Sequence, residues 1–198
     1  MKVVFATSNQ GKVKEVREAL KEFGIEVLSL REVGKELPPP EETGNTFCEN
    51  AYQKATYYSK ALELPVIAED SGLEVEALNG LPGVLSSRFA GENATDEENN
   101  LKLIEELKKR NLTSSPARYV SFFFFSFPKG FGLWSEGEVK GKVIVEPKGE
   151  GGFGYDPLFI PEGYGKTMAE LPLKEKNRIS HRGRAIKKLI ELLKKVNW

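Results

Sequence analysis

Two adjacent carboxylates are the residues of this chain best suited to acid–base or metal chemistry. Glu69 and Asp70 follow the short apolar run of residues 66–68 and precede Ser71 and Gly72. Such a run is typical of a buried strand, so the pattern places both acids at the C-terminal end of a strand. Carboxylates in that position are costly without a cationic neighbour, so we expect a lysine, an arginine or a metal ion beside them. An acid followed by Ser-Gly is also common turn chemistry, and taken alone the segment is more often a surface turn.

A polar loop between a predicted strand and a predicted helix is a candidate phosphate site. Residues 2–6 are β-branched and aromatic, as in a buried strand, and the apolar residues of 13–23 recur at helical spacing. The free N–H groups and the dipole of a helix N-terminus attract an anion. Phosphate binding is therefore expected here, although an ordinary strand-to-helix connection has the same pattern. The loop consists of Thr7, Ser8, Asn9, Gln10, Gly11 and Lys12.

A second acid-bearing segment precedes another predicted helix. Glu41 lies in a loop, and Thr46 with Glu49 three residues later gives the signature of a capping box. In the helix that follows, Asn50 and Lys54 are four residues apart, so both side chains project from one face. We expect that face to border a cleft.

Two further segments carry polar and aromatic side chains suited to a nucleobase. The glycine-rich loop 149–157 interleaves aromatic rings for stacking with an acid that accepts from ring N–H groups. The basic segment 174–183 leads into a predicted terminal helix, where cations in the first turn oppose the helix dipole. We therefore expect anionic or carbonyl partners for these cations. The candidate residues are Phe153, Gly154, Tyr155, Asp156, Lys176, His181 and Arg182.

The remaining apolar patterns predict the elements that position these residues. Alternation and β-branched composition indicate strands, and apolar residues at helical spacing indicate helices. The predicted strands are 25–30, 73–77, a central strand at 119–127 and its hairpin partner at 131–145, and a capping box at Thr95 and Glu98 opens another helix.

Composition restricts the class of protein. The 198 residues are 39% hydrophobic and carry 29 Lys+Arg against 29 Asp+Glu, and this zero net charge argues against a general nucleic-acid or membrane-surface binder. With one cysteine and one histidine, neither an intramolecular disulfide nor the usual Cys/His zinc sets can form, so any metal is expected to be Mg²⁺ or Mn²⁺ held by oxygen ligands. No apolar run approaches about 18 residues, and we expect a cytoplasmic protein. Without a linker, residues 1–198 are expected to form one domain, and two lobes sharing a sheet also fit.

The phosphate loop, the pair of acid-bearing segments, the glycine-rich loop and the basic segment together indicate a nucleotide polyphosphate with Mg²⁺. Their order along the chain resembles the inosine triphosphate pyrophosphatase family. That family hydrolyses non-standard purine nucleoside triphosphates. The resemblance covers nearly the whole chain. The matching stretches, in the family's order, are ATSNQGK, EETGNTFCENAYQKA, AEDSGLEV, LPGVLSSRFAGENATD, GGFGYDPLF, GKTMAEL and EKNRISHRGRA.

The resemblance implies a fold and an assembly. It implies an α/β protein with two lobes around a long, twisted, mixed sheet, with helices packed on it and the active site in the cleft between the lobes. It also implies a homodimer. The implied reaction converts ITP, dITP or XTP to the monophosphate and pyrophosphate by water attack on the α-phosphorus.

The resemblance also implies roles for individual residues. Asp70 looks like the general base and a metal ligand, and Glu41 looks like the other Mg²⁺ ligand. Residues 7–12 look like the triphosphate cradle, with Lys54 as a further phosphate contact, and Ser71 contacts substrate. Phe153, Gly154, Tyr155, Asp156, Lys176, His181 and Arg182 look like the base pocket.

Two departures and two alternatives remain open. Many relatives have a second aspartate where this chain has Glu69, which leaves the role of Glu69 undefined. The run of four phenylalanines at 122–125 is bulkier than we expect for the family's central strand. The alternatives are a nucleotide-binding or sensing module without turnover, and a pyrophosphatase for other modified nucleotides. A pure binding module does not require a base near the α-phosphate, so the presence of both Glu41 and Asp70 favours the hydrolase.

Overall fold

One mixed, six-stranded sheet runs through the protein. The structure is a computed structural model, and it describes residues 1–196. The strand order is β2-β1-β3-β4-β5-β6, with β1 parallel to both β2 and β3, and β5 antiparallel to β6. The predicted mixed sheet and the central place of the phenylalanine-rich strand are therefore confirmed. The strands are β1 (Lys2–Phe5), β2 (Glu26–Ser29), β3 (Val66–Val75), β4 (Ser114–Ser126), β5 (Gly132–Ile144) and β6 (Phe159–Pro161).

Helices connect and cover these strands, and their starts follow the capping signals in the sequence. The Thr46 hydroxyl accepts from the Glu49 amide at 3.1 Å, and Thr95 with Glu98 forms a complete capping box. The α-helices are α1 (Gln10–Lys21), α2 (Leu30–Val33), α3 (Phe47–Leu62), α4 (Asp96–Lys109), α5 (Leu173–Ile179) and α6 (His181–Leu193). Short 3-10 helices are η1 (Glu76–Leu78), η2 (Gly83–Arg88), η3 (Asp156–Leu158) and η4 (Met168–Glu170).

The chain divides into two compact units, and three of the four boundaries fall inside strands while the fourth falls inside α6. The first unit contains residues 1–70, 121–137 and the segment from Arg182 onward, and the second contains residues 71–120 and 138–181. Strands β3, β4 and β5 each contribute residues to both units. The expectation of a single domain with its site in a cleft between lobes stays a prediction.

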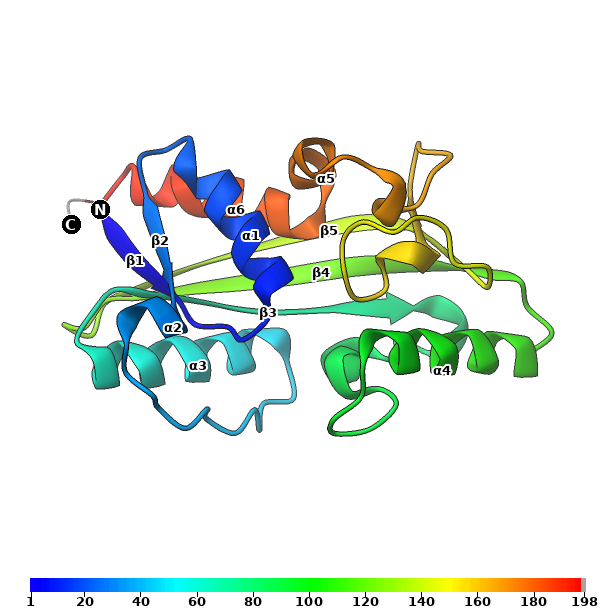
Figure 1. Cartoon of the computed structure of the whole chain (residues 1–198), viewed down its shortest axis with the longest axis horizontal. Coiled ribbons are helices and arrows are strands. Elements are labelled where there is room, and N and C mark those ends of the chain that lie inside the picture. The colour runs from blue at the N-terminus through cyan, green and yellow to red at the C-terminus, as the bar shows by residue number, and fades with distance from the viewer. Residues whose placement is uncertain (197–198) are drawn as a thin grey trace. The chain divides into compact units, whose positions relative to one another are not determined.

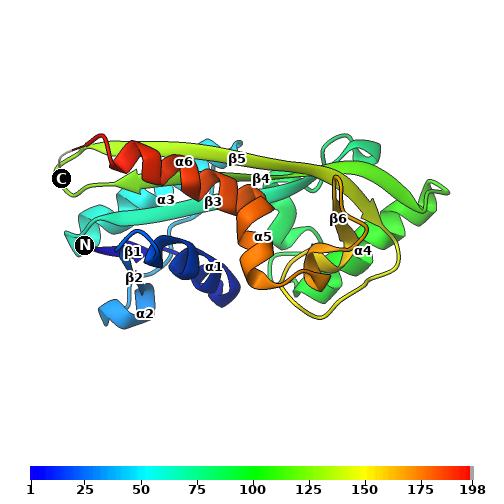
Figure 2. The same ribbon diagram turned by 90° about the horizontal axis from the view of Figure 1, so that it is seen from above.

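In the first unit, helices cover both faces of the strands. Helices α1 and α6 share a core with Phe5, Ile67 and Phe123. Helix α3 packs on the opposite face, against Val4 and Ala68. Figures 1 and 2 show these two helical layers on either side of β1 and β3. Because side chains alternate along a strand, Ile67 faces the α1 and α6 layer while Ala68 faces the α3 layer.

The second unit has one core of its own. Helix α4 contributes Leu103 and Leu107, and the strands contribute Leu73, Val75 and Tyr119. The glycine-rich segment 149–157 forms no strand and ends in the 3-10 helix η3. The end of this segment packs into the same core through Tyr155 and Leu158.

Two predicted boundaries differ from the structure. We expected a strand to stop at Glu69 and another to begin at Leu73, but β3 is continuous from Val66 to Val75. The two acids consequently lie inside a strand, not at its end or in a turn. A buried charge inside a strand is tolerated when it is paired, and Glu69 contacts two cationic side chains. Helix α5 was also not anticipated as an element separate from the terminal helix.

Candidate active site

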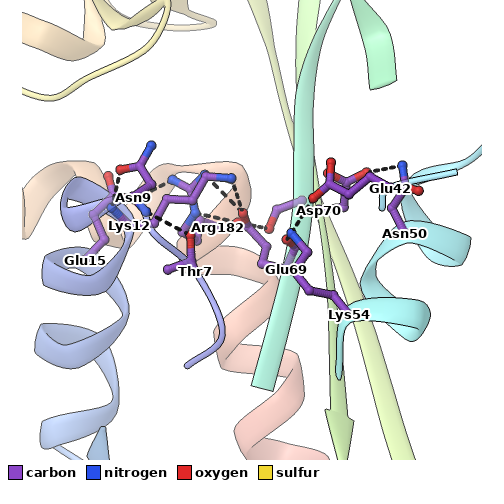
Figure 3. Close-up of polar contacts among 11 residues, drawn as sticks. Thr7, Asn9, Lys12, Glu15, Glu42, Asn50, Lys54, Glu69, Asp70 and Arg182 are labelled. Carbon is purple, nitrogen blue, oxygen red and sulfur yellow. Dashed lines mark hydrogen bonds and ion pairs between the residues drawn. The ribbon is translucent and has the colours of Figure 1, made fainter. Parts of the chain in front are cut away.

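The side chain of Glu69 is the centre of a buried ionic cluster in the first unit. Its carboxylate accepts from the Arg182 guanidinium, from the Lys12 ammonium at 3.0 Å and from the Ser121 hydroxyl at 2.7 Å. A second carboxylate, that of Glu15 on α1, pairs with the same guanidinium. Figure 3 shows Lys12, Glu15 and Arg182 gathered on one side of β3. The predicted cationic neighbours of the strand's acids are therefore present.

Arg182 is charged in this setting because its two partners outweigh its burial. Burial alone would lower the pKa of the guanidinium, and the carboxylates of Glu69 and Glu15 reverse this, so the pKa of Arg182 is raised. Arg182 lies in the first turn of α6, where the helix dipole opposes a cation. The predicted anionic partner of this residue is confirmed by both carboxylates.

The polar loop after β1 has the geometry of a helix N-terminal turn. Asn9 is the N-cap of α1, and its side-chain oxygen accepts from the Lys12 amide at 3.1 Å. Thr7 accepts from the Asn9 amide at 3.2 Å through its hydroxyl. Ser8 and Gln10 are exposed, and Gly11 is half-buried. The loop therefore presents a capped helix start with Lys12 beside it.

Asp70 faces the opposite layer from Glu69. Its carboxylate accepts from the Asn50 side-chain amide at 3.1 Å, and the Asn50 side-chain oxygen accepts from the Gly44 amide at 2.8 Å. Lys54 donates to the Glu69 carbonyl at 3.0 Å and pairs with Glu42 at 2.8 Å. Figure 3 shows Asp70 with Glu42, Asn50 and Lys54 on this side of the strand. Asn50 and Lys54 thus both contact β3, and the cleft predicted beside them stays a prediction.

Opposing influences set the protonation of Asp70. Burial raises the pKa of this carboxyl from its ordinary 3.8 to about 6, and the negative charge of Glu42 adds to the increase. Lys54, Lys12 and the Asn50 hydrogen bond act in the opposite direction. The carboxyl is consequently ionised near neutral pH but still basic enough to accept a proton.

Glu42, which sequence reasoning passed over, is the acid that the structure brings near Asp70. Glu42 is half-buried and paired with Lys54, whereas Glu41 is exposed. The assignment of Glu41 as a metal ligand stays a prediction. Adjacent acids in a loop point in different directions, and without a helix or strand period the sequence does not indicate whether Glu41 or Glu42 faces Asp70.

A second polar cluster lies in the second unit, around Asp156. The buried Lys176 ammonium donates to the Asp156 carboxylate at 2.6 Å and lies 4.5 Å from the centre of the Phe153 ring. The same carboxylate accepts from the Phe153 amide at 3.1 Å. Gly152 has φ +68°, and a Cβ there would lie 2.2 Å from an Asp156 oxygen. Glycine is therefore required for this close approach.

Two neighbouring residues of this loop, Gly154 and Tyr155, are held by contacts with other segments. Tyr155 is buried and its hydroxyl donates to the Ser86 carbonyl at 2.6 Å, and burial together with Asp96 raises the pKa of that hydroxyl. The Gly154 amide donates to the Asp96 carboxylate at 2.8 Å. The buried Tyr155 ring anchors the loop. The Phe153 ring is half-buried and is therefore the more accessible of the two predicted stacking surfaces.

His181 also belongs to the second unit. Its ring stacks on Tyr119, with centroids 4.4 Å apart and planes 9° from parallel. The Tyr119 hydroxyl lies 3.4 Å from Asp156 as a donor. The structure thus gathers Asp156, Lys176 and His181, together with Tyr119, which no sequence pattern indicated as a site residue. Arg182, predicted for the same pocket, instead has the two carboxylate partners of the first unit, and its role in base binding stays a prediction.

The chemistry of the donors around Asp70 fits a hard divalent cation. Within residues 1–196, no group of three or more His, Cys, Asp or Glu side chains is arranged to hold a metal. Mg²⁺ commonly uses only one or two carboxylates and completes its shell with water and substrate phosphates. Asp70 with a glutamate of the 41–44 loop is a donor set of that kind.

Comparison with known proteins identifies the family. Residues 3–192 match the Ham1 family. The chain belongs to this family. A dITP/XTP pyrophosphatase of Desulfotalea psychrophila is 51% identical over 93% of this chain and 81% of its own length. The dITP/XTP pyrophosphatase of Aquifex aeolicus is 48% identical over 98% of this chain and 97% of its own length.

Solved Ham1 structures share the fold. The HAM1 protein of Coxiella burnetii matches with a TM-score of 0.86 and 39% identity, covering 99% of this chain and 100% of that one. The Ham1 protein of Staphylococcus aureus matches with a TM-score of 0.82 and 40% identity, covering 98% of both chains. The predicted family and the α/β fold are therefore confirmed.

Proposed function

We propose that this chain is a nucleoside triphosphate pyrophosphatase for non-standard purine nucleotides. It would convert ITP, dITP and XTP to the monophosphate and pyrophosphate, and so cleanse the nucleotide pool. The observation that carries the proposal is the buried Asp70 carboxylate, which accepts from Asn50 at 3.1 Å and has its pKa raised to about 6. Its Ham1 relatives bear the name dITP/XTP pyrophosphatase, which supports this choice of substrate class.

In the proposed reaction Asp70 is the general base. Water attacks the α-phosphorus as Asp70 takes one of its protons, and the bond to the bridging oxygen of pyrophosphate breaks. Phosphoryl transfer mainly requires positioning and charge neutralisation. The Lys12 ammonium and the N-terminus of α1 would neutralise the phosphates, with Lys54 as a further contact and Ser71 touching substrate.

We propose Mg²⁺ as the cofactor, with Mn²⁺ as a substitute. Asp70 and an acid of the 41–44 loop, Glu41 by resemblance or Glu42 by its position, would hold the ion. The ion would supply positive charge against the phosphate oxygens. Asn50 would orient Asp70 for this purpose, since its amide donates to one carboxylate oxygen and leaves the other available.

The cluster of the second unit would bind the base. A 6-oxopurine presents an acceptor at position 6, whereas adenine presents an amino donor. Donors such as Lys176 and His181 suit the first and would be left without partners by the second, and such a mismatch can discriminate strongly. Phe153 would stack on the purine ring, and Asp156 would accept from ring N–H groups.

A substrate panel with product identification tests the proposal. With Mg²⁺, we expect ITP, dITP and XTP to be hydrolysed much faster than ATP or GTP, and pyrophosphate to appear in equal amount to the monophosphate. Chromatography of nucleotides and a pyrophosphate-specific assay measure both products. Release of orthophosphate and a nucleoside diphosphate would exclude attack at the α-phosphorus.

The assembly follows from the resemblance, and the location and the excluded partners follow from the composition of the sequence. We propose a homodimer in the cytoplasm, with the nucleotide as its small-molecule ligand and without a nucleic-acid or membrane partner. Within residues 1–196, no helix has the length and apolar character that a membrane span requires.

A further inference from the structure

Glu69 has no role in the chemistry proposed above, yet it is among the most completely buried charged residues of the first unit. The residue is 1% exposed, and its side chain is fully buried. A buried carboxylate is costly unless it is paired, and this one is enclosed by Arg182, Lys12 and Ser121. Replacing a whole buried ion cluster with well-packed apolar side chains is often neutral or favourable for stability. Stability alone therefore gives no reason for a charge at this position.

The contacts of Glu69 reach both proposed phosphate lysines. Its carboxylate lies 3.0 Å from the Lys12 ammonium, and its carbonyl accepts from the Lys54 ammonium at 3.0 Å. These two lysines are on different helices, α1 and α3, on opposite faces of β3. Glu69 is thus the residue of the strand that touches both.

Glu15 supplies an internal comparison. Glu15 and Glu69 are 2% and 1% exposed, and both pair with the guanidinium of Arg182. Glu69 also forms a salt bridge with Lys12, at 3.0 Å. The two carboxylates are therefore matched in burial and in their Arg182 partner, and Glu69 adds this contact with the phosphate loop.

We propose that Glu69 is a positioning residue that fixes the Lys12 ammonium for the triphosphate, while Arg182 and Ser121 hold the Glu69 carboxylate in place. A lysine side chain is long and flexible, so an ammonium without a fixed partner samples many positions. A displacement of about 1 Å at a reacting group can reduce turnover about 100-fold. The inference rests on the proposed pyrophosphatase function.

Paired isosteric substitutions test the proposal on the full-length protein. We expect Glu69→Gln to lower kcat for ITP by about 10-fold or more, because Lys12 loses its fixed partner. Glu15→Gln, which leaves the Lys12 pair intact, should change kcat by less than about 3-fold. Thermal unfolding of both variants measures their structural effect. If the two variants lose activity in parallel, or in proportion to their loss of Tm, Glu69 is only structural and the proposal is overturned.

Binding without turnover separates position from affinity. Calorimetry with inorganic tripolyphosphate in EDTA is expected to show unchanged or tighter binding for Glu69→Gln, because the cluster loses a negative charge. A loss of tripolyphosphate binding equal to the loss of kcat would mean that the phosphate loop has collapsed, which contradicts a positioning role.

A double-mutant cycle identifies Lys12 as the target. In a Lys12→Met background, Glu69→Gln should alter kcat by less than about 2-fold, because the group that Glu69 positions is already gone. A full 10-fold effect in that background would show that Glu69 acts elsewhere. Hydrolysis of ITP by the wild-type protein in the same series tests the proposed pyrophosphatase function, whereas the comparison of variants tests the role of Glu69.

A neutral substitution keeps the test available if Glu69→Gln does not fold. Ser121→Ala removes the hydroxyl that donates to Glu69 at 2.7 Å and leaves every charge in place. We expect a 2- to 5-fold lower kcat. Ser135→Ala is the matched control, since Ser135 is equally buried and donates to the Ala185 carbonyl at 2.7 Å. Equal kcat values for both serine variants and wild type would also overturn the proposal.

Discussion

At the scale of single residues, Asp70 combines burial with a nearby acid and two lysines. Burial is the largest influence and raises the pKa of its carboxyl, while Lys54 and Lys12 lower it. Ionised Asp70 is therefore less stable in the folded protein than in water. The residue proposed as the base thus carries a stability penalty that a neutral replacement removes.

Asp70→Asn is expected to abolish turnover while ITP binding survives, and to stabilise the metal-free fold at high pH. Between pH 3.8 and about 6 the folded protein retains a proton that the unfolded chain has released. Protonation of Asp70 accordingly contributes fully to the free energy of unfolding below pH 3.8, and this contribution is lost as the pH rises through about 6. At pH 8 the variant should gain up to about 3 kcal/mol of unfolding free energy.

Urea unfolding in EDTA at pH 8 and at pH 4 measures this gain. At pH 4 wild type and Asp70→Asn should have nearly equal stability, because the wild-type carboxyl is then mostly protonated. A variant that is less stable than wild type at pH 8 would contradict the raised pKa, and near-normal kcat would exclude Asp70 as the base.

At the scale of elements, the loop 41–44 is joined to α3 by the Glu42–Lys54 ion pair and by a backbone contact at Gly44. The Gly44 amide donates to the Asn50 side chain, which in turn donates to Asp70. A Cβ at Gly44 would lie 2.6 Å from the Asn50 oxygen and 2.7 Å from the Glu49 Cβ. Glycine is needed at this position because the loop lies so close to the helix.

Gly44→Ala should therefore displace the acid-bearing loop and the Asn50 amide together. We expect kcat for ITP to fall about 10-fold or more, with a higher Mg²⁺ concentration needed for half-maximal activity. Gly165→Ala is the control, since a methyl group there meets nothing within 4 Å. Steady-state kinetics across a Mg²⁺ series make the measurement. Equal Mg²⁺ dependence for both alanine variants would show that the loop does not position the metal-binding acid.

Local signals in the sequence were sufficient to predict most of the elements. Capping signatures predicted the starts of α3 and α4, although only α4 has the complete capping box, and apolar runs predicted β1 and β4. The continuity of β3 could not be predicted, because a charged pair inside a strand depends on partners far along the chain. Arg182 and Glu69 are 113 residues apart, and no local pattern connects them.

Other contacts had a weak local signal that was not used. Glu15 is three residues after Lys12 on the same helix, so both lie on one face of α1. If Lys12 binds phosphate, Glu15 needs a different cation as its partner, and in the structure that cation is Arg182. Glu42 had no such signal, since its orientation depends on the anchoring of Gly44.

At the scale of the whole molecule, the two compact units share strands β3, β4 and β5. Neither unit is a continuous segment of chain. Because each shared strand supplies backbone to both units, we expect the units to lose their structure in one cooperative transition.

A core substitution in one unit should thus be detected by a probe in the other. Leu103 is fully buried in the second unit, and Leu103→Ala should lower the unfolding free energy by about 2–5 kcal/mol. Trp134 stacks on Phe122 in the first unit, with centroids 5.4 Å apart. In a Trp198→Phe background, Trp134 fluorescence and far-UV circular dichroism should give the same urea midpoint. Separate midpoints would show that the units unfold independently.

The alternation of β3 makes the order of its two acids as important as their presence. Glu69 faces Lys12 and Arg182, and Asp70 faces Asn50 on the other side of the strand. A variant in which the two are exchanged, Glu69→Asp with Asp70→Glu, keeps the composition, charge and strand propensity of the segment. It would nevertheless give each helical layer a carboxylate of the wrong length. Each acid of β3 therefore fits the partners on only one face of the strand, and the order Glu-Asp at positions 69 and 70 determines which carboxylate each helical layer contacts.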